Sequence, residues 1–246
     1  MSRYSQTGLT PAWVLHSRPY SNTSLLVDLF TLNFGRITCV ARGVRKKGSR
    51  LAAIVQPFIP LVTSISGRGA VKTLGKCEAV DRYQALQGER LYSAYYLNEL
   101  ILKALPVSEP HDQLFAVYAD ILGELTTGKE QTELLLRKFE LHLLSELGYG
   151  LQLDYDVKSG EPIQVSKQYR YEHATGAIEV TGSDHLQHSI PVVSGECLLA
   201  LKDFRLTEKP HLAEAKKLMR YLINHLLGGY HFKSREFFTN RYQRKI

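Results

Sequence analysis

Residues 24–50 of the chain read SLLVDLFTLNFGRITCVARGVRKKGSR. Ser24–Thr31 is rich in Leu, Val and Phe, and Asn33-Phe34-Gly35 supplies the residue types of a hairpin turn. Residues 36–42 then alternate between two faces of a strand. One face carries Ile37, Cys39 and Ala41, and the other carries Arg36, Thr38, Val40 and Arg42. The stretch therefore predicts two strands of a sheet, followed by a basic loop.

Three further strands are expected around this pair. They cover Ala12–His16, Phe58–Ser66 and Val71–Val80, with Gly67-Arg68-Gly69 as the turn between the last two. Five short strands in about 70 residues, with one longer basic connection at Gly43–Arg50, predict a small barrel. A five-stranded OB-fold is the commonest such barrel that also binds nucleic acid.

From Gly88 onward the apolar residues follow helical spacing. Helices are expected over residues 91–105, 108–127, 130–147, 194–204 and 212–226, with a polar, turn-rich stretch and a hairpin near Ala174-Thr175-Gly176 before the last two. The sequence thus predicts a two-domain α+β protein. The OB-fold barrel is assigned to residues 1–82 and an all-helical domain to residues 83–246, with an irregular loop and hairpin insertion at 150–192.

The positive charge is concentrated in the first domain. Residues 1–80 hold eleven Lys and Arg against only Asp28 and Glu78, a net charge of +9. The other 166 residues hold 20 basic and 22 acidic residues. A generally basic protein would spread its charge evenly, so this distribution favours a module that contacts a polyanion, most often nucleic acid.

The loop Gly43–Arg50 is the sharpest local signal, because four of its last six residues are cationic. Such a loop can follow a phosphate backbone and release condensed counterions, although a solvated hairpin loop is the alternative. Tyr20 is the aromatic residue expected to be exposed, where it can stack on a base. The predicted DNA-binding residues are Arg18, Arg36, Arg42, Arg45, Lys46, Lys47, Arg50, Arg68 and Lys72.

Other function classes find little support. Residues 67–73 lack the glycine that a phosphate loop needs before its lysine, because Val71 occupies that position. His185 and His188 have no cysteine near them and no helix to support a metal site, so no metal or cofactor is expected, and no catalytic motif is present. Three widely spaced cysteines, no apolar run of about 20 residues and no signal peptide at the start together favour a cytoplasmic protein.

An ordered set of motifs along the chain resembles the RecO family of bacterial recombination mediators. The motifs are Val14-Leu15-His16-Ser17-Arg18-Pro19-Tyr20-Ser21, Thr23-Ser24-Leu25, Gly35-Arg36, Ala41-Arg42-Gly43-Val44-Arg45, Gln56-Pro57-Phe58, Tyr96-Leu97-Asn98-Glu99-Leu100, Arg137-Lys138-Phe139-Glu140, Leu147-Gly148-Tyr149-Gly150 and Lys233-Ser234-Arg235-Glu236-Phe237-Phe238. Each is loose alone, but their order from Ala12 to Phe238 is specific.

This resemblance implies a non-enzymatic protein of DNA repair, located in the bacterial cytoplasm at the nucleoid. Family members bind single- and double-stranded DNA, anneal complementary strands, and engage single-strand binding protein and RecR to help load RecA. Some relatives carry a four-cysteine zinc site in the region equivalent to Tyr155–Val180. This chain has no cysteine there, so the resemblance implies a zinc-free version.

The acidic, aromatic-ended tail of single-strand binding protein requires a hydrophobic groove with a cation at its edge. The helix at 130–147 offers Leu134, Leu141 and Leu144 for such a groove, with Arg137 on the same face and Lys138 beside it. An ion pair of Arg137 with Glu133 or Glu140 is the alternative. Two other functions also remain open: an OB-fold RNA-binding adaptor, and a scaffold for acidic proteins.

Overall fold

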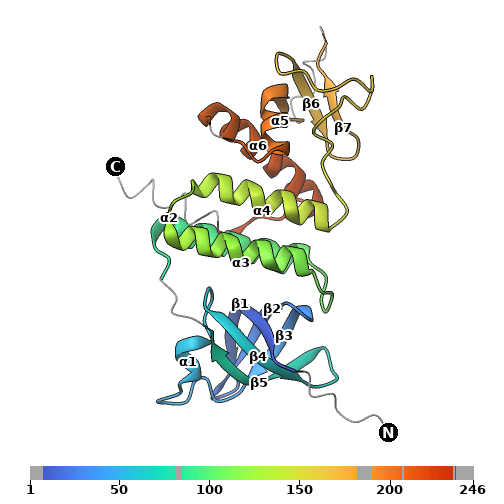
Figure 1. Cartoon of the computed structure of the whole chain (residues 1–246). Helices are drawn as coiled ribbons and strands as arrows, with labels where there is room; N and C mark the ends of the chain where they lie inside the picture. Colours follow the sequence, from blue (N-terminus) through green and yellow to red (C-terminus); the bar gives the residue numbers. More distant parts are fainter. Residues whose placement is uncertain (1–7, 81–84, 182–189, 207, 235, 237–246) are drawn as a thin grey trace. The chain divides into compact units, whose positions relative to one another are not determined.

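The computed structural model describes residues 8–80, 85–181, 190–206, 208–234 and 236 (Figure 1). The chain forms two compact units. The first, here called the barrel unit, comprises Met1–Gly128 and Phe232–Ile246; the second, the hairpin unit, comprises Lys129–His231. Each unit is described by itself.

A closed five-stranded barrel forms the start of the barrel unit. Its strands are β1 (Thr10–Tyr20), β2 (Ser24–Thr31), β3 (Gly35–Ala41), β4 (Pro60–Ser66) and β5 (Val71–Ala79), in the order β1-β2-β3-β5-β4. β1 closes the ring by antiparallel pairing with β4, and β3 pairs with β5 in parallel. A single turn of helix, α1 (Leu51–Ile54), connects β3 to β4. This arrangement confirms the predicted OB-fold.

The barrel interior is filled by alternate side chains of each strand. Ile37, Cys39 and Ala41 are buried, as the alternation predicted, while the residues between them are partly exposed. They pack with Val14, Val27, Leu29, Ile59, Leu61 and Leu74 among others. Burial raises the pKa of the Cys39 thiol to about 12, although the nearby Lys72 opposes the shift. This thiol is therefore protonated and a packing residue.

Two helices, α2 (Gly88–Ala104) and α3 (Asp112–Thr127), lie side by side over one end of the barrel (Figure 1). The Phe30 ring points out of the barrel and contacts Phe115 and Tyr118 of α3, with centroid distances of 5.3 and 5.9 Å. Asn98 of α2 donates a hydrogen bond to the Leu15 carbonyl at 2.9 Å and accepts one from the Tyr118 hydroxyl. The aromatic residues of β1 and β2 thus serve as a platform for helices.

The start of the C-terminal segment belongs to the same unit. The buried Phe232 ring lies 5.2 Å from that of Tyr96, and Glu99 of α2 accepts hydrogen bonds from the backbone amides of Lys233 and Ser234 at 2.9 Å. The Ser234 hydroxyl also donates to Glu99 at 2.6 Å. The Glu99 carboxylate therefore holds the backbone of Lys233 and Ser234 against α2.

In its described residues, the hairpin unit combines three helices with a small sheet. Its elements are α4 (Thr132–Glu146), β6 (Gln168–Glu172), β7 (Gly176–Glu179), β8 (Val192–Ser194), α5 (Gly195–Lys202) and α6 (Lys209–Leu226), and the sheet order is β7-β6-β8. The β6–β7 hairpin confirms the turn expected near residues 174–176. Ser194 caps α5 by accepting a hydrogen bond from the Cys197 amide. The core between these elements includes Leu144, Tyr169, Val193, Leu198, Leu201, Leu218 and Met219.

A buried carboxylate organises the irregular segment before the hairpin. Asp156 accepts hydrogen bonds from the amides of Lys158 and Ser159 at 2.7 and 2.8 Å, and from the amide of Glu179 in β7 at 2.5 Å. Burial alone would raise the Asp156 pKa, but the hydrogen bonds from Ser159, Glu179 and Lys158 outweigh it and lower the pKa. One side chain thus ties the segment to the sheet.

The expected division at residues 82 and 83 separates the barrel from the first long helix. The contacts group the chain differently, because α2 and α3 bury aromatic surface against β1 and β2, and the hairpin unit begins only at Lys129. Secondary structure type changes near residue 88, but the compact units change near residue 129.

Candidate nucleic-acid interface

The outer face of β1, β2 and β3 places cations around an apolar floor. In the strand register Arg18 of β1 lies opposite Leu26 of β2, which lies opposite Val40 of β3. Leu26 and Val40 are half-buried, and Arg18 is exposed. Because neighbouring strands lie about 4.8 Å apart, these three side chains form one row across the barrel.

A second row lies two residues further along the strands. Tyr20, 51% exposed, is paired with Ser24, and the exposed Arg42 follows Ala41, the residue next to Val40 in β3. Arg18 and Arg42 therefore flank the floor on opposite sides, with the Tyr20 ring beside them. An exposed ring beside guanidinium groups can stack on a base while the cations contact phosphates.

The single carboxylate of these three strands is already engaged. Thr38 donates a hydrogen bond of 2.6 Å to Asp28, and the His16 ring lies 3.8 Å from the same carboxylate. In the strand register Asp28 lies opposite His16 on β1 and opposite Thr38 on β3, so its carboxylate is within reach of both side chains. Its interactions with these neighbours reduce the repulsion that it would exert on a phosphate.

The basic loop 43–50 packs beside the β1–β2 turn. The Arg45 amide donates to the Thr23 carbonyl at 2.9 Å, and its guanidinium donates to the Ser21 carbonyl at 3.1 Å. Lys46 and Lys47 are exposed. Arg45 thus anchors the loop, and the two lysines extend the cationic surface that begins with Arg42.

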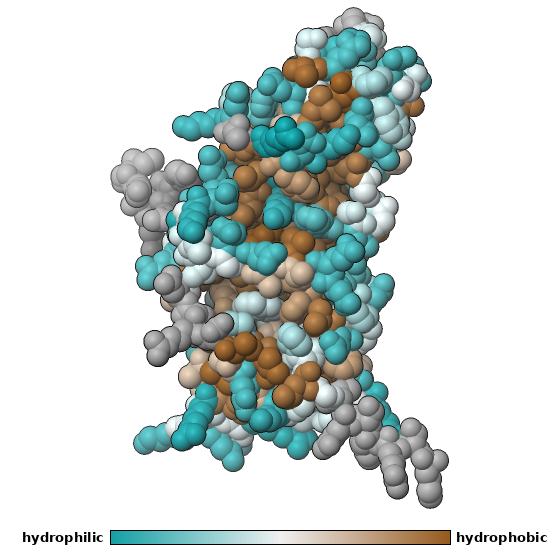
Figure 2. Space-filling view, viewed as in Figure 1, coloured by the Kyte–Doolittle hydropathy of each residue, from teal (hydrophilic) through white to brown (hydrophobic). Residues whose placement is uncertain are grey.

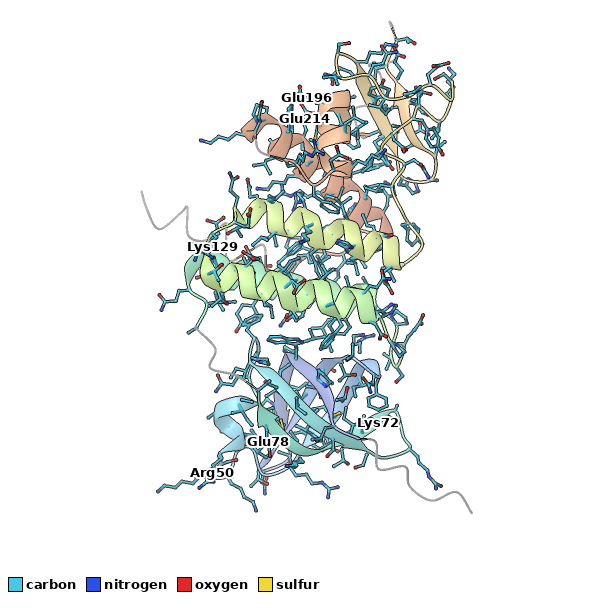
Figure 3. All side chains as sticks on the ribbon, in the orientation of Figure 1. Arg50, Lys72, Glu78, Lys129, Glu196 and Glu214 are labelled. Atoms are coloured by element: carbon cyan, nitrogen blue, oxygen red, sulfur yellow. The ribbon has the colours of Figure 1, made fainter. Side chains whose placement is uncertain are left out.

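The other predicted cations of the barrel lie further apart. Arg50 and Lys72 lie on opposite sides of the barrel in Figure 3, and Arg68 is exposed in the β4–β5 loop. Lys72 shares the inward face of β5 with Leu74, and its ammonium donates to the Gly67 carbonyl at 3.3 Å. On the face shown in Figure 2, hydrophilic side chains gather at the barrel end farthest from α3.

Arg36 is separated from the predicted surface. It lies six residues before Arg42, or about 20 Å along the strand. Its Nε donates a hydrogen bond of 3.0 Å to the carbonyl of Leu105, the residue that ends α2. A guanidinium at this position satisfies a free carbonyl and opposes the negative end of the helix dipole. The structure therefore gives Arg36 a packing role and brings together Arg18, Arg42 and the basic loop.

Sequence reasoning missed the apolar floor of Leu26 and Val40, because each was assigned to a strand without its partner. Their alternation with inward-facing residues was visible, yet only the register places them in one row with Arg18. Tyr20 was expected to be exposed, and it is.

The hairpin unit contains a groove of about 340 Å³ between the end of α4, the following loop and the end of α5. Its lining residues are Leu141, His142, Ser145, Gly150, Leu151, Gln152, Leu153, Asp154, Leu201, Lys202 and Phe204. The His142 ring stacks on Phe204 at 5.6 Å, and Lys202 pairs with Asp154 at 3.0 Å. Burial and, to a lesser degree, the Lys138 ammonium lower the His142 pKa, so its ring is neutral at pH 7.

The predicted tail-binding residues on α4 do not all lie at the groove. Leu141 lines the groove, and Leu134 packs against the core of the unit. Arg137 is buried, with its Nε 2.6 Å from one oxygen of Glu140 and its Nη2 2.9 Å from the other. This is one of the pairings that the sequence left open. The cation at the groove is Lys202, with Lys138 one turn before His142.

Within the part of the chain that the structure describes, no cluster of three or more His, Cys, Asp or Glu is placed to hold a metal ion. None of the described helices is both long and apolar enough to span a membrane. His185 and His188, as well as the motif residues Arg235, Phe237 and Phe238, lie outside the described residues.

Comparison with known proteins agrees with this geometry. Residues 1–83 match the family model described as recombination protein O N terminal, and residues 85–236 match recombination protein O C terminal. The DNA repair protein RecO of Methylococcus capsulatus is 42% identical over 96% of this chain and 95% of its own. Those of Azoarcus sp. and Vibrio parahaemolyticus are 41% and 40% identical, over 91% and 97% of this chain and 92% and 96% of their own. The chain therefore belongs to the recombination protein O family.

Proposed function

We propose that this protein acts in DNA repair by binding single- and double-stranded DNA on the outer face of β1–β3 and along the basic loop. It anneals complementary strands and performs no chemistry itself. The relatives that share about 40% of its residues are named DNA repair proteins. The proposal places the protein in the bacterial cytoplasm, at the nucleoid.

The observation that carries this proposal is that cations, an apolar floor and an exposed aromatic ring lie on one face of the barrel. Arg18 and Arg42 flank an apolar floor, Tyr20 presents an exposed ring, and Lys46 and Lys47 continue the cationic surface. Cations that contact phosphates supply affinity without reading sequence, and a ring stacks on any base. Annealing requires this kind of binding, since the protein must hold strands of any sequence and leave their pairing edges free.

The proposal includes three protein partners, which the family resemblance supplies. With RecR, the protein helps to load RecA on DNA that is covered by single-strand binding protein. The acidic tail of single-strand binding protein fits the groove of the hairpin unit, because Leu141, Leu151 and Phe204 offer apolar surface there. Lys202 and Lys138 supply the cations for a carboxylate.

A salt series of binding and annealing assays tests the proposal. With about six phosphate contacts at a slope of roughly −0.7 each, affinity for a single-stranded oligonucleotide should fall about 10²- to 10³-fold between 50 and 200 mM salt. Replacing Lys46 and Lys47 by Gln should reduce the slope by about 1.4 and slow annealing. If the protein binds no DNA even at low salt, a scaffold for acidic proteins is favoured. If it binds structured RNA more tightly than single-stranded DNA, an RNA adaptor is favoured. Either result would contradict the proposal.

The tail contact is tested separately with an acidic tail peptide. Replacement of Lys202 by Gln should weaken peptide binding by about tenfold or more, because a carboxylate leaving water loses a charge-assisted partner. The matched control is Lys158→Gln, an exposed lysine of the same unit that does not line the groove. Equal peptide affinity in the two variants would place the tail elsewhere.

A further inference from the structure

The last long helix of the hairpin unit concentrates positive charge in an acidic surrounding. α6 holds four cations, Lys209, Lys216, Lys217 and Arg220, against the single carboxylate of Glu214. The other residues of Lys129–His231 hold eight cations and thirteen carboxylates. The positive charge of this unit is therefore gathered on one helix, although the unit as a whole is acidic.

The helix turns these cations to solvent on one face. Residues 209, 213, 217 and 220 follow the 3.6-residue period and are exposed, whereas the opposite face is buried. Glu214 is directed away from the cations, since its carboxylate accepts hydrogen bonds from the Ser194 amide and hydroxyl at 2.8 and 2.7 Å. Lys216 pairs with Glu133 at 2.9 Å. Lys209, Lys217 and Arg220 thus form a stripe that no carboxylate of α6 interrupts.

A cluster of rings flanks the stripe. Tyr221 and His225 lie one turn apart on α6, and His173 reaches them from the β6–β7 hairpin. The His173 and His225 rings stack at 4.0 Å with an interplanar angle of 5°, and the Tyr221 ring lies 4.6 Å from His225. Both histidines are exposed. Planar rings beside a row of cations are the surface on which unpaired bases and their phosphates bind.

We infer that the exposed face of α6, together with the His173–Tyr221–His225 cluster, is a second nucleic-acid-binding surface that holds a second single strand. The inference rests on the proposed function, in which β1–β3 holds the first strand. From Lys209 to Arg220 the helix rises about 16 Å, which matches about five nucleotides at the 3.4 Å rise of a stacked strand. Two surfaces on one chain would let the protein hold both strands of an annealing pair.

The experiment compares two double substitutions with the same change in charge. The test variant is Lys217→Gln with Arg220→Gln, and the control is Lys129→Gln with Lys158→Gln, two exposed lysines of the same unit that do not belong to α6. Each variant is first titrated with one labelled oligonucleotide. Its 1:1 complex is then titrated with a second, non-complementary oligonucleotide across a salt series, and annealing of complementary strands is timed.

The test variant should bind the first strand within about twofold of wild type. Loss of two phosphate contacts should lower the salt slope for the second strand by about 1.4 and weaken its binding about 25-fold at 0.1 M salt. Annealing should slow in parallel, and the control should behave as wild type. His173→Ala should also weaken the second strand, by about fivefold or more, through loss of stacking.

Three results would overturn the inference. The first is unchanged second-strand binding and annealing in the test variant. The second is an equal loss of affinity for both strands, which would make α6 part of one continuous site. The third is a loss of affinity for an acidic peptide alone, which would make the stripe a protein-docking surface. Failure of the proposed function is a different result, because wild-type protein would then bind no first strand at any salt concentration.

Discussion

Arg36 near the start of β3 and Arg42 directly after its end should respond differently to the same substitution. Arg42 is exposed beside the basic loop, where its guanidinium can reach a phosphate. Arg36 is partly buried about 20 Å away, and its Nε donates to the Leu105 carbonyl at the end of α2. Substitution of Arg42 should therefore weaken DNA binding, and substitution of Arg36 should lower the stability of the fold.

The magnitudes follow from these contacts. Arg42→Gln removes one phosphate contact, so the salt slope should fall by about 0.7 and affinity should drop about fivefold at 0.1 M salt, with the melting temperature unchanged. Arg36→Gln removes a charge-assisted hydrogen bond from a partly exposed site, which costs about 1 to 2 kcal/mol. The melting temperature should then fall by about 2 to 8 °C, with the salt slope unchanged.

Both properties are measured on both variants. Fluorescence anisotropy of a labelled single-stranded oligonucleotide between 50 and 200 mM salt gives the slope, and thermal unfolding gives the melting temperature. If Arg36→Gln lowers the slope as much as Arg42→Gln does, the assignment of Arg36 to the helix end is refuted. If Arg42→Gln leaves the slope intact, the outer face of β3 is not the phosphate-binding surface.

The barrel could be predicted from sequence because β3 and β4 alternate between buried and more exposed side chains, and glycines mark the β2–β3 and β4–β5 turns. Ser24–Thr31 begins and ends where the pattern placed it. β1 runs four residues beyond the expected end at His16, since β2 pairs with it as far as Tyr20. The helix α1 was missed, because one turn of helix inside a polar connection has no periodicity to detect.

The candidate site could be predicted only as a set of cations. The sequence shows that Arg36 and Arg42 face outward, but the hydrogen bond from Arg36 joins residues 69 positions apart, which no local pattern contains. For Arg137, the sequence could not choose between Glu133 and Glu140, because both lie within reach on one helix face. The buried pair with Glu140 is set by tertiary packing.

Two remaining predictions concern stability. Gly35→Ala should lower the melting temperature at least twice as far as Gly48→Ala. Both glycines have positive φ, but of the two only Gly35 would bring its new Cβ against a backbone atom, 1.7 Å from the Glu109 carbonyl oxygen. Equal losses of melting temperature would contradict this close approach. Asp156→Asn should cost about 1 to 3 kcal/mol at pH 7, because an amide NH₂ would face the Glu179 amide donor, whereas Asp154→Asn, which breaks an exposed pair with Lys202, should cost less than about 1 kcal/mol. Since the folded-state pKa of Asp156 is lowered, its contribution is present above the ordinary carboxyl pKa near 4 and is lost as the pH falls through the lower folded value. Urea unfolding at pH 7 and pH 3 should therefore show a smaller gap between wild type and Asp156→Asn at pH 3, and an equal gap at both pH values would mean that the carboxylate's charge does not hold the segment to the sheet.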